Sequence, residues 1–217
     1  MNSITFDPTT VAIILTTLTM APFVLLLISS FVKIVVVLTL IRNALGVQQV
    51  PPNMVLNGIA IMLTIYIMYP VIQDTFELTK TMEFNMNNLA ALKDPLTKAC
   101  GPLKKFLKRH TKSRGRAFFL NTAKEIWPKE MQSGLEEGNL IVLIPAFVVS
   151  ELTDAFQIGF LLYLPFIAID MIVSNILLAM GMMMVSPMTI SLPFKLMLFV
   201  LVDGWTKMIE GIVKTYR

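Results

Sequence analysis

The sequence predicts an all-α fold of the membrane type, with long hydrophobic helices interrupted by prolines and one polar helical insert. Three observations indicate this fold. Hydrophobic residues make up 55% of the 217 residues and charged residues only 15%, whereas a typical soluble domain carries about 25% charge. Long runs without any charge occupy both ends of the chain, and most charges gather in the middle. The pattern divides the chain into three parts, 1–73, 74–139 and 140–217, and argues against a soluble enzyme or a disordered chain.

The first part, residues 1–73, contains two charge-free runs at 8–32 and 43–73. A helix that crosses a lipid bilayer needs about 20 apolar residues, so each run is long enough. Residues 1–7 lack the basic segment that begins a signal peptide, and the apolar run after them is too long for one. We therefore expect the first hydrophobic helix to stay in the mature protein.

The middle part, residues 74–139, carries 12 basic and 8 acidic side chains and hence the whole net charge of +4. Prolines and glycines divide it into short amphipathic pieces, which predicts a separate, water-exposed helical insert. Seven basic residues lie in Lys104–Arg116. This stretch is either a solvated helix face or a patch for nucleic acid or anionic lipid, but it has little aromatic content for base stacking. His110, within the stretch, has no second metal ligand nearby.

The last part, residues 140–217, contains a short charge-free run at 155–169 and a longer one at 171–194. The longer run reaches spanning length, whereas the shorter one does so only if it extends back through Glu151 and Asp154 to Leu140. Prolines interrupt the hydrophobic segments of both ends, and each is expected to kink or end a helix. Kinks in lipid need protein neighbours for the freed carbonyl groups, so packed helical hairpins are expected. These prolines are Pro22, Pro70, Pro145, Pro165, Pro187 and Pro193.

Six charges stand in or beside the apolar segments, where an ionisable side chain is costly without a partner or water. Glu151 and Asp154 are three residues apart and therefore share one helix face. They could form structural ion pairs, with Lys195 or Arg42 as the base, or they could relay protons or ions. The six expected buried charges are Arg42, Glu151, Asp154, Asp170, Lys195 and Asp203.

Three consecutive methionines, Met182, Met183 and Met184, follow Gly181. Methionine usually fills irregular gaps in a core. Successive positions on a helix point about 100° apart, however, so three in a row cannot share one face. With Gly181 before them and Ser186 and Pro187 after them, they indicate a loop, which could form a soft apolar constriction.

Motifs for catalysis are absent from the sequence. It contains no phosphate-binding loop, dinucleotide fingerprint or nucleophile elbow. The only cysteine, Cys100, excludes an intrachain disulfide and a cysteine metal cluster. We therefore expect no enzyme activity, no catalytic residue, no cofactor and no metal.

Two long segments resemble the signatures of the FliP/SctR family of type III secretion export-apparatus proteins. The first comprises Phe31–Leu38 and Arg42–Asn53, and the second extends from Ser150 through the methionines to Trp205. The resemblance covers nearly the whole chain except the insert. Because the chain begins directly at its first hydrophobic helix, it resembles the injectisome-type members more than the flagellar ones.

The resemblance implies a helical pore subunit of the export gate, which passes unfolded proteins across the bacterial inner membrane. Five copies would assemble with a small two-helix subunit and a larger related subunit, largely on the periplasmic side, with the insert facing the periplasm. The methionines Met182–Met184 would form a gasket around the closed pore, and Glu151 would pair with Lys195 of a neighbouring subunit. No nucleic acid partner is implied. The alternative is an ion- or proton-coupled transporter that uses Glu151, Asp154 and Asp170.

Overall fold

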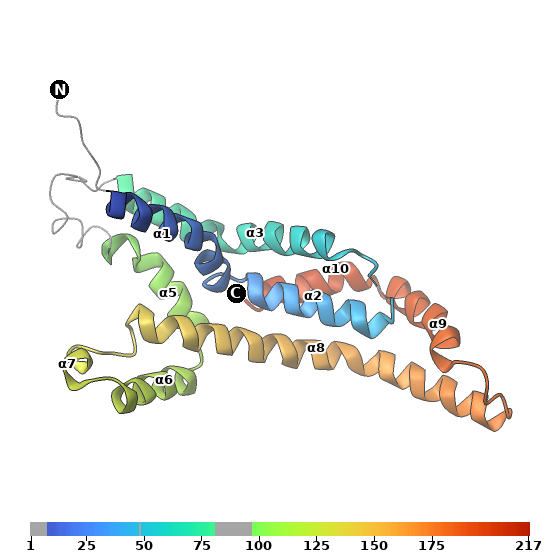
Figure 1. Ribbon diagram of the computed structural model, residues 1–217. Helices are drawn as coiled ribbons and strands as arrows, with labels where there is room; N and C mark the ends of the chain where they lie inside the picture. Colours follow the sequence, from blue (N-terminus) through green and yellow to red (C-terminus); the bar gives the residue numbers. More distant parts are fainter. Residues whose placement is uncertain (1–7, 48, 81–96) are drawn as a thin grey trace.

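The computed structural model describes residues 8–47, 49–80 and 97–217. These residues form nine helices and no strand, which confirms the all-α class. Figure 1 shows an elongated molecule in which the longest helix, α8, runs along one side. In chain order the helices are α1 (Pro8–Leu27), α2 (Phe31–Leu45), α3 (Asn53–Lys80), α5 (Gly101–His110), α6 (Ser113–Ile126), α7 (Lys129–Gln132), α8 (Leu140–Ala179), α9 (Pro187–Leu201) and α10 (Gly204–Lys214).

Helix α2 is the centre of the fold. Its buried residues recur at three- and four-residue spacing from Lys33 to Leu45, so they form one stripe along a helix. The helix ends at Gly46, whose φ of 76° lies in the left-handed region and whose N–H donates to the Asn43 carbonyl. Glycine takes this conformation without the steric cost that a side chain brings, so Gly46 ends the helix cleanly.

The first charge-free run does not form one straight helix. It is bent by 63° at residues 28–30, between α1 and α2. Pro22, which was expected to break this run, lies inside α1 instead. Ser29 and Ser30 occupy the bend and are buried.

Helix α8 is continuous over 40 residues and joins two runs that the sequence separated. Pro145 and Pro165 lie inside it, as Pro70 lies inside α3, so these prolines do not end their helices. At 1.5 Å per residue, α8 is about 60 Å long. Of the later prolines, Pro187 begins α9, where its missing N–H costs nothing.

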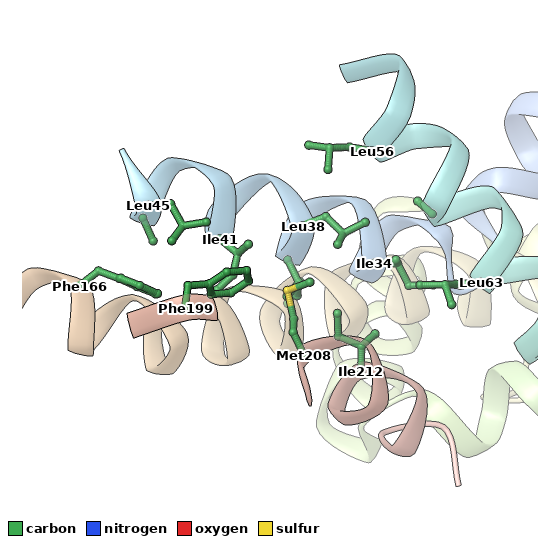
Figure 2. Packing of buried hydrophobic residues seen from close by; sticks show 14 residues of the cluster. Ile34, Leu38, Ile41, Leu45, Leu56, Leu63, Phe166, Phe199, Met208 and Ile212 are labelled. Carbon is green, nitrogen blue, oxygen red and sulfur yellow. The ribbon is translucent and has the colours of Figure 1, made fainter. Parts of the chain in front are cut away.

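One hydrophobic core lies where α2 meets α3, α8, α9 and α10. Figure 2 shows Leu38 and Ile41 of α2 pointing toward Phe199 and Met208. Ile34 and Leu38 are fully buried in this cluster. The C-terminal helices α9 and α10 thus close the core from the side opposite α3.

The insert is not a separate body. Helix α3 crosses the predicted boundary at 73/74 and continues to Lys80. A second core, in which Phe106 and Leu107 of α5 pack on Leu143 and Phe147, ties the insert to the beginning of α8. Helix α6 also lies against α8 in this region.

The hydrophobic surface is extensive. Helices α3 and α8 are long and apolar enough to cross a membrane, and the bent α1–α2 pair could form a third span. Large apolar side chains of α8 such as Phe156, Phe160 and Leu161 are exposed in the single chain. The chain therefore has long apolar faces that lipid or other subunits must cover.

Candidate functional site

The methionines lie in a loop at the far end of the molecule. Helix α8 ends at Ala179 and α9 begins at Pro187, so residues 180–186 connect the two helices. Gly181 adopts φ +73°, which lets the chain turn back after α8. Figure 1 shows this turn at the end of the molecule opposite the insert. The predicted loop is confirmed.

The loop exposes its methionines to an unusual degree. Met182 is 41% exposed, Met183 is 83% exposed and Met184 is completely exposed. A methionine that fills a core would be buried, so core filling does not explain them. Met183 and Met184 form a soft apolar tip with little cover from the rest of the described chain, and Met182 is partly covered.

Glu151 lies in a buried ionic cluster between α2 and α8. Its Oε1 is 2.8 Å from Nζ of Lys33, and their side chains are only 0% and 3% exposed. Lys33 also approaches Asp154 at 3.7 Å, so Glu151 and Asp154 do share a face, as predicted. Asp154 forms a second ion pair with Lys112, at 2.6 Å. A buried charge requires such partners.

The C-terminus completes this cluster. The hydroxyl of Tyr216 donates a hydrogen bond to Oε2 of Glu151, and Nζ of Lys33 lies 4.4 Å from the centre of the Tyr216 ring. Burial, together with the charge of Glu151, raises the pKa of Tyr216 far above its usual range. Tyr216 therefore stays a hydrogen-bond donor at any physiological pH.

Lys195 lies in a second ionic cluster, with Asp170 as its partner. Its Nζ is 2.6 Å from Oδ2 of Asp170 and donates to the carbonyl of Ala44. The hydroxyl of the fully buried Ser191 donates to the other oxygen of Asp170. Through Lys195 the cluster links α9 to α8 and to the C-terminal carbonyl groups of α2, where the helix dipole is negative.

Glu151 and Lys195 are therefore not partners within one chain. Lys33 and Ala44, which mark the two clusters on α2, are separated by about 16 Å of helix. Each of the two predicted residues already has a partner in the chain: Lys33, which is buried, and Asp170, whose side chain is 41% exposed. Their contact between neighbouring subunits stays a prediction, and it would require Glu151 to leave Lys33.

The remaining predicted charges have different roles. Arg42 does not pair with an acid in the described chain; its Nη1 donates to Oδ1 of Asn53 at 2.6 Å and so joins α2 to α3. Asp203 differs from the prediction, because it is exposed in the single chain. It precedes α10 with φ 52°, and its Oδ1 accepts a hydrogen bond from Thr206.

Sequence reasoning missed Lys33, Lys112 and Tyr216. A signal for Lys33 was present, because it is the only charge between Pro8 and Ile41. Lys112 and Tyr216 lie in the insert and at the C-terminus, so no local pattern links them to α8. Among the described residues, no group of three potential ligands could hold a metal ion.

His110 is half-buried beside the Glu151 cluster, not on a solvated face. Its ring lies between Phe106, at 4.7 Å, and Tyr216, at 5.1 Å, measured between ring centres. Burial, together with the positive charges of Lys33 and Arg109, lowers the pKa of His110 from 6.5 to about 4.

The shifted pKa predicts a pH-dependent stability. Between pH 6.5 and about 4 the unfolded chain binds a proton at His110 that the folded chain does not bind, so folding loses stability as the pH falls through this range. The His110→Gln variant should lose this part of the pH dependence. Melting temperatures of the detergent-solubilised protein from pH 7.5 to 4 would measure it. Identical pH profiles for variant and wild type would contradict the assignment to His110.

Residues 14–212 match the FliP family. The chain belongs to the FliP family. Among its relatives, Yop proteins translocation protein R of Yersinia pestis is 50% identical over 210 residues, which cover 97% of both chains. Harpin secretion protein HrcR of Erwinia amylovora is 44% identical over 216 residues, covering 100% of both. Virulence protein YscR of Salmonella typhimurium is 43% identical over 203 residues, covering 94% of both.

Membership of the FliP family confirms the resemblance found in the sequence, injectisome type included. The names of the three relatives refer to translocation, secretion and virulence. As a FliP-family protein, the chain is a membrane-associated component of a type III secretion apparatus and not an enzyme.

Proposed function

We propose that this chain forms the protein-conducting pore of a type III secretion export gate, through which unfolded proteins cross the bacterial inner membrane. The exposed loop Met182–Met184 is the observation that carries the proposal. In a ring of copies, each loop would contribute a flexible apolar tip that excludes water from the closed pore. Methionine adapts its shape, so the same loops could seal around varied cargo segments.

The apolar faces of the single chain support assembly with other subunits. Helix α8 is hydrophobic on all of its faces. Its side chains Phe156, Phe160 and Leu161 are therefore exposed in the single chain. We propose that five copies, a small two-helix subunit and a larger related subunit cover these faces, as the family resemblance implies. The assembly would lie largely on the periplasmic side of the inner membrane, with the region 74–139 facing the periplasm.

Replacing Met182–Met184 by three alanines tests the pore proposal. The variant should leak small ions across the membrane, because alanine has neither the volume nor the flexibility to close the constriction. Leakage is measured as potassium efflux from cells that express the assembled complex. The matched control replaces the exposed methionines Met54, Met62 and Met131 by alanine and should not leak. Unchanged efflux in the loop variant, with normal assembly, would refute the gasket.

An ion- or proton-coupled transporter is the competing proposal, with Glu151, Asp154 and Asp170 as the relay. Glu151 and Asp170 are separated by about 28 Å along α8, and each is engaged by its own lysine. Asp154→Asn separates the two proposals: a relay would lose transport with assembly intact, whereas a structural charge would affect assembly first.

A further inference from the structure

An open apolar groove of about 830 Å³ lies between α1, α3 and the beginning of α5. Leu25 of α1 and Ile28 of the following bend form one wall, and Ile65 and Ile72 of α3 form the other. Leu103 of α5 lies at the groove as well. On α3 the lining extends from Ile61 to Thr79, a length of about 27 Å. That length exceeds the roughly 15 Å of hydrocarbon in one leaflet of a bilayer.

Three lysines stand where the groove meets the end of α3 and the beginning of α5. Each adjoins a lining residue in the chain: Lys80 follows Thr79, Lys98 precedes Ala99, and Lys104 follows Leu103. The ion pairs of the described residues include none of these lysines. Nζ of Lys80 lies 4.4 Å from the centre of the Phe76 ring, and Phe76 itself lines the groove.

The lining of the groove is thus apolar along its length, and lysines adjoin it in the chain at one end. The nearest acids on α3, Asp74 and Glu77, line a separate cleft together with Lys105. An apolar helix from another subunit would fill the groove but would bring no counter-charge to these lysines, which form no ion pair among the described residues. A phosphate headgroup supplies that charge, and basic clusters beside apolar segments bind anionic lipids in this way.

We propose that the groove binds an anionic phospholipid, with one acyl chain between α1 and α3 and the phosphate at Lys80, Lys98 and Lys104. This site is independent of the methionine loop, which lies at the other end of the molecule. The lipid would hold α1 against α3 and the insert.

Native mass spectrometry of the full chain, extracted with its co-purifying subunits and titrated with phosphatidylglycerol, tests the headgroup contact. Changing Lys80, Lys98 and Lys104 to glutamine should reduce retained phosphatidylglycerol at least about fivefold, because each basic residue near an anionic lipid strengthens binding several-fold. The control changes Lys124, Lys129 and Lys207, exposed lysines elsewhere, to glutamine. It removes the same charge and should retain lipid as the wild type does.

A second pair of variants tests the acyl-chain groove. Thr75→Trp fills the groove that Thr75 lines and should reduce lipid retention to a similar degree. Thr153→Trp is the matched control, because Thr153 is exposed on α8 and its hydroxyl makes the same bond to the carbonyl four residues earlier. Equal retention of phosphatidylcholine and phosphatidylglycerol, or unchanged retention in either test variant, would overturn the proposal. So would a photo-crosslinker at position 75 that captures a protein subunit and no lipid.

Discussion

The Lys33→Met variant is expected to lose a large part of the stability of the isolated chain. It leaves Glu151 as an unpaired carboxylate that is 0% exposed, and breaking a buried ion pair from one side costs about 3–5 kcal/mol. For a chain of this size, that corresponds to a fall of roughly 6–20 °C in melting temperature. Thermal unfolding of the detergent-solubilised full chain would measure the loss.

The double variant Lys33→Met with Glu151→Met is the control for this prediction. It removes both charges together, and apolar replacement of a whole buried pair is often neutral. The double variant should therefore be more stable than Lys33→Met alone. A double variant as unstable as the single one would show that Lys33 contributes through packing and not through its charge.

Charge reversal separates the pair within the chain from the pair between subunits. Glu151→Lys should block assembly of the complex in native gels. If Lys33 is the functional partner, adding Lys33→Glu restores assembly and adding Lys195→Glu does not. Restoration by Lys195→Glu would instead support the predicted contact between neighbouring copies.

Gly159→Leu is the second variant for which a large loss of stability is expected, because α2 and α8 approach each other closely there. A Cβ atom at position 159 would lie 2.2 Å from Cδ1 and 3.2 Å from Cβ of Leu40. The Cδ1 atom can rotate away, but the Cβ atom is fixed by the backbone of α2. The leucine must therefore push the helices apart. Inserting smaller groups into a packed core costs about 1–3 kcal/mol of stability, so the leucine should cost at least as much. The melting temperature should fall by at least roughly 4 °C.

Two further variants test whether contact with Leu40 causes the expected loss of stability at position 159. Gly58 is also helical, but a Cβ there would meet no atom within 4 Å. Gly58→Ala should therefore be neutral or slightly stabilising, since alanine favours helix over glycine by about 1 kcal/mol. Combining the smaller change Gly159→Ala with Leu40→Ala should recover stability relative to Gly159→Ala alone. If it does not, contact with Leu40 is not the reason that glycine is needed.

The sequence predicted what depends on local pattern. Gly181 and the three methionines indicated a loop, and the structure has one. The full length of α8 was not predicted, because Asp170 divided the apolar runs and Pro145 and Pro165 were expected to kink or end a helix. A proline removes only one N–H and one backbone bond, and a long helix with many remaining bonds tolerates that loss.

The sequence predicted that the buried acids form ion pairs, but it did not predict which lysines they pair with. Glu151 and Asp154 were expected to find bases, and the bases proved to be Lys33 and Lys112. Their separation in the chain exceeds 35 residues in every case, and only the tertiary packing of α2, α5 and α8 selects among the lysines. The exposure of Asp203 also follows from the tertiary packing, and a hydropathy pattern could not show it.

The long helix α8 also acts as a lever. Contacts with α2, with α9 and in the second core hold it as far as Asp170, whereas the methionine loop lies beyond its far end, about 14 Å from Asp170. A rotation of about 10° of this free end about Asp170 would move the loop by roughly 2 Å over this length. Repeated around a ring, such small rotations would change the aperture without unfolding any helix.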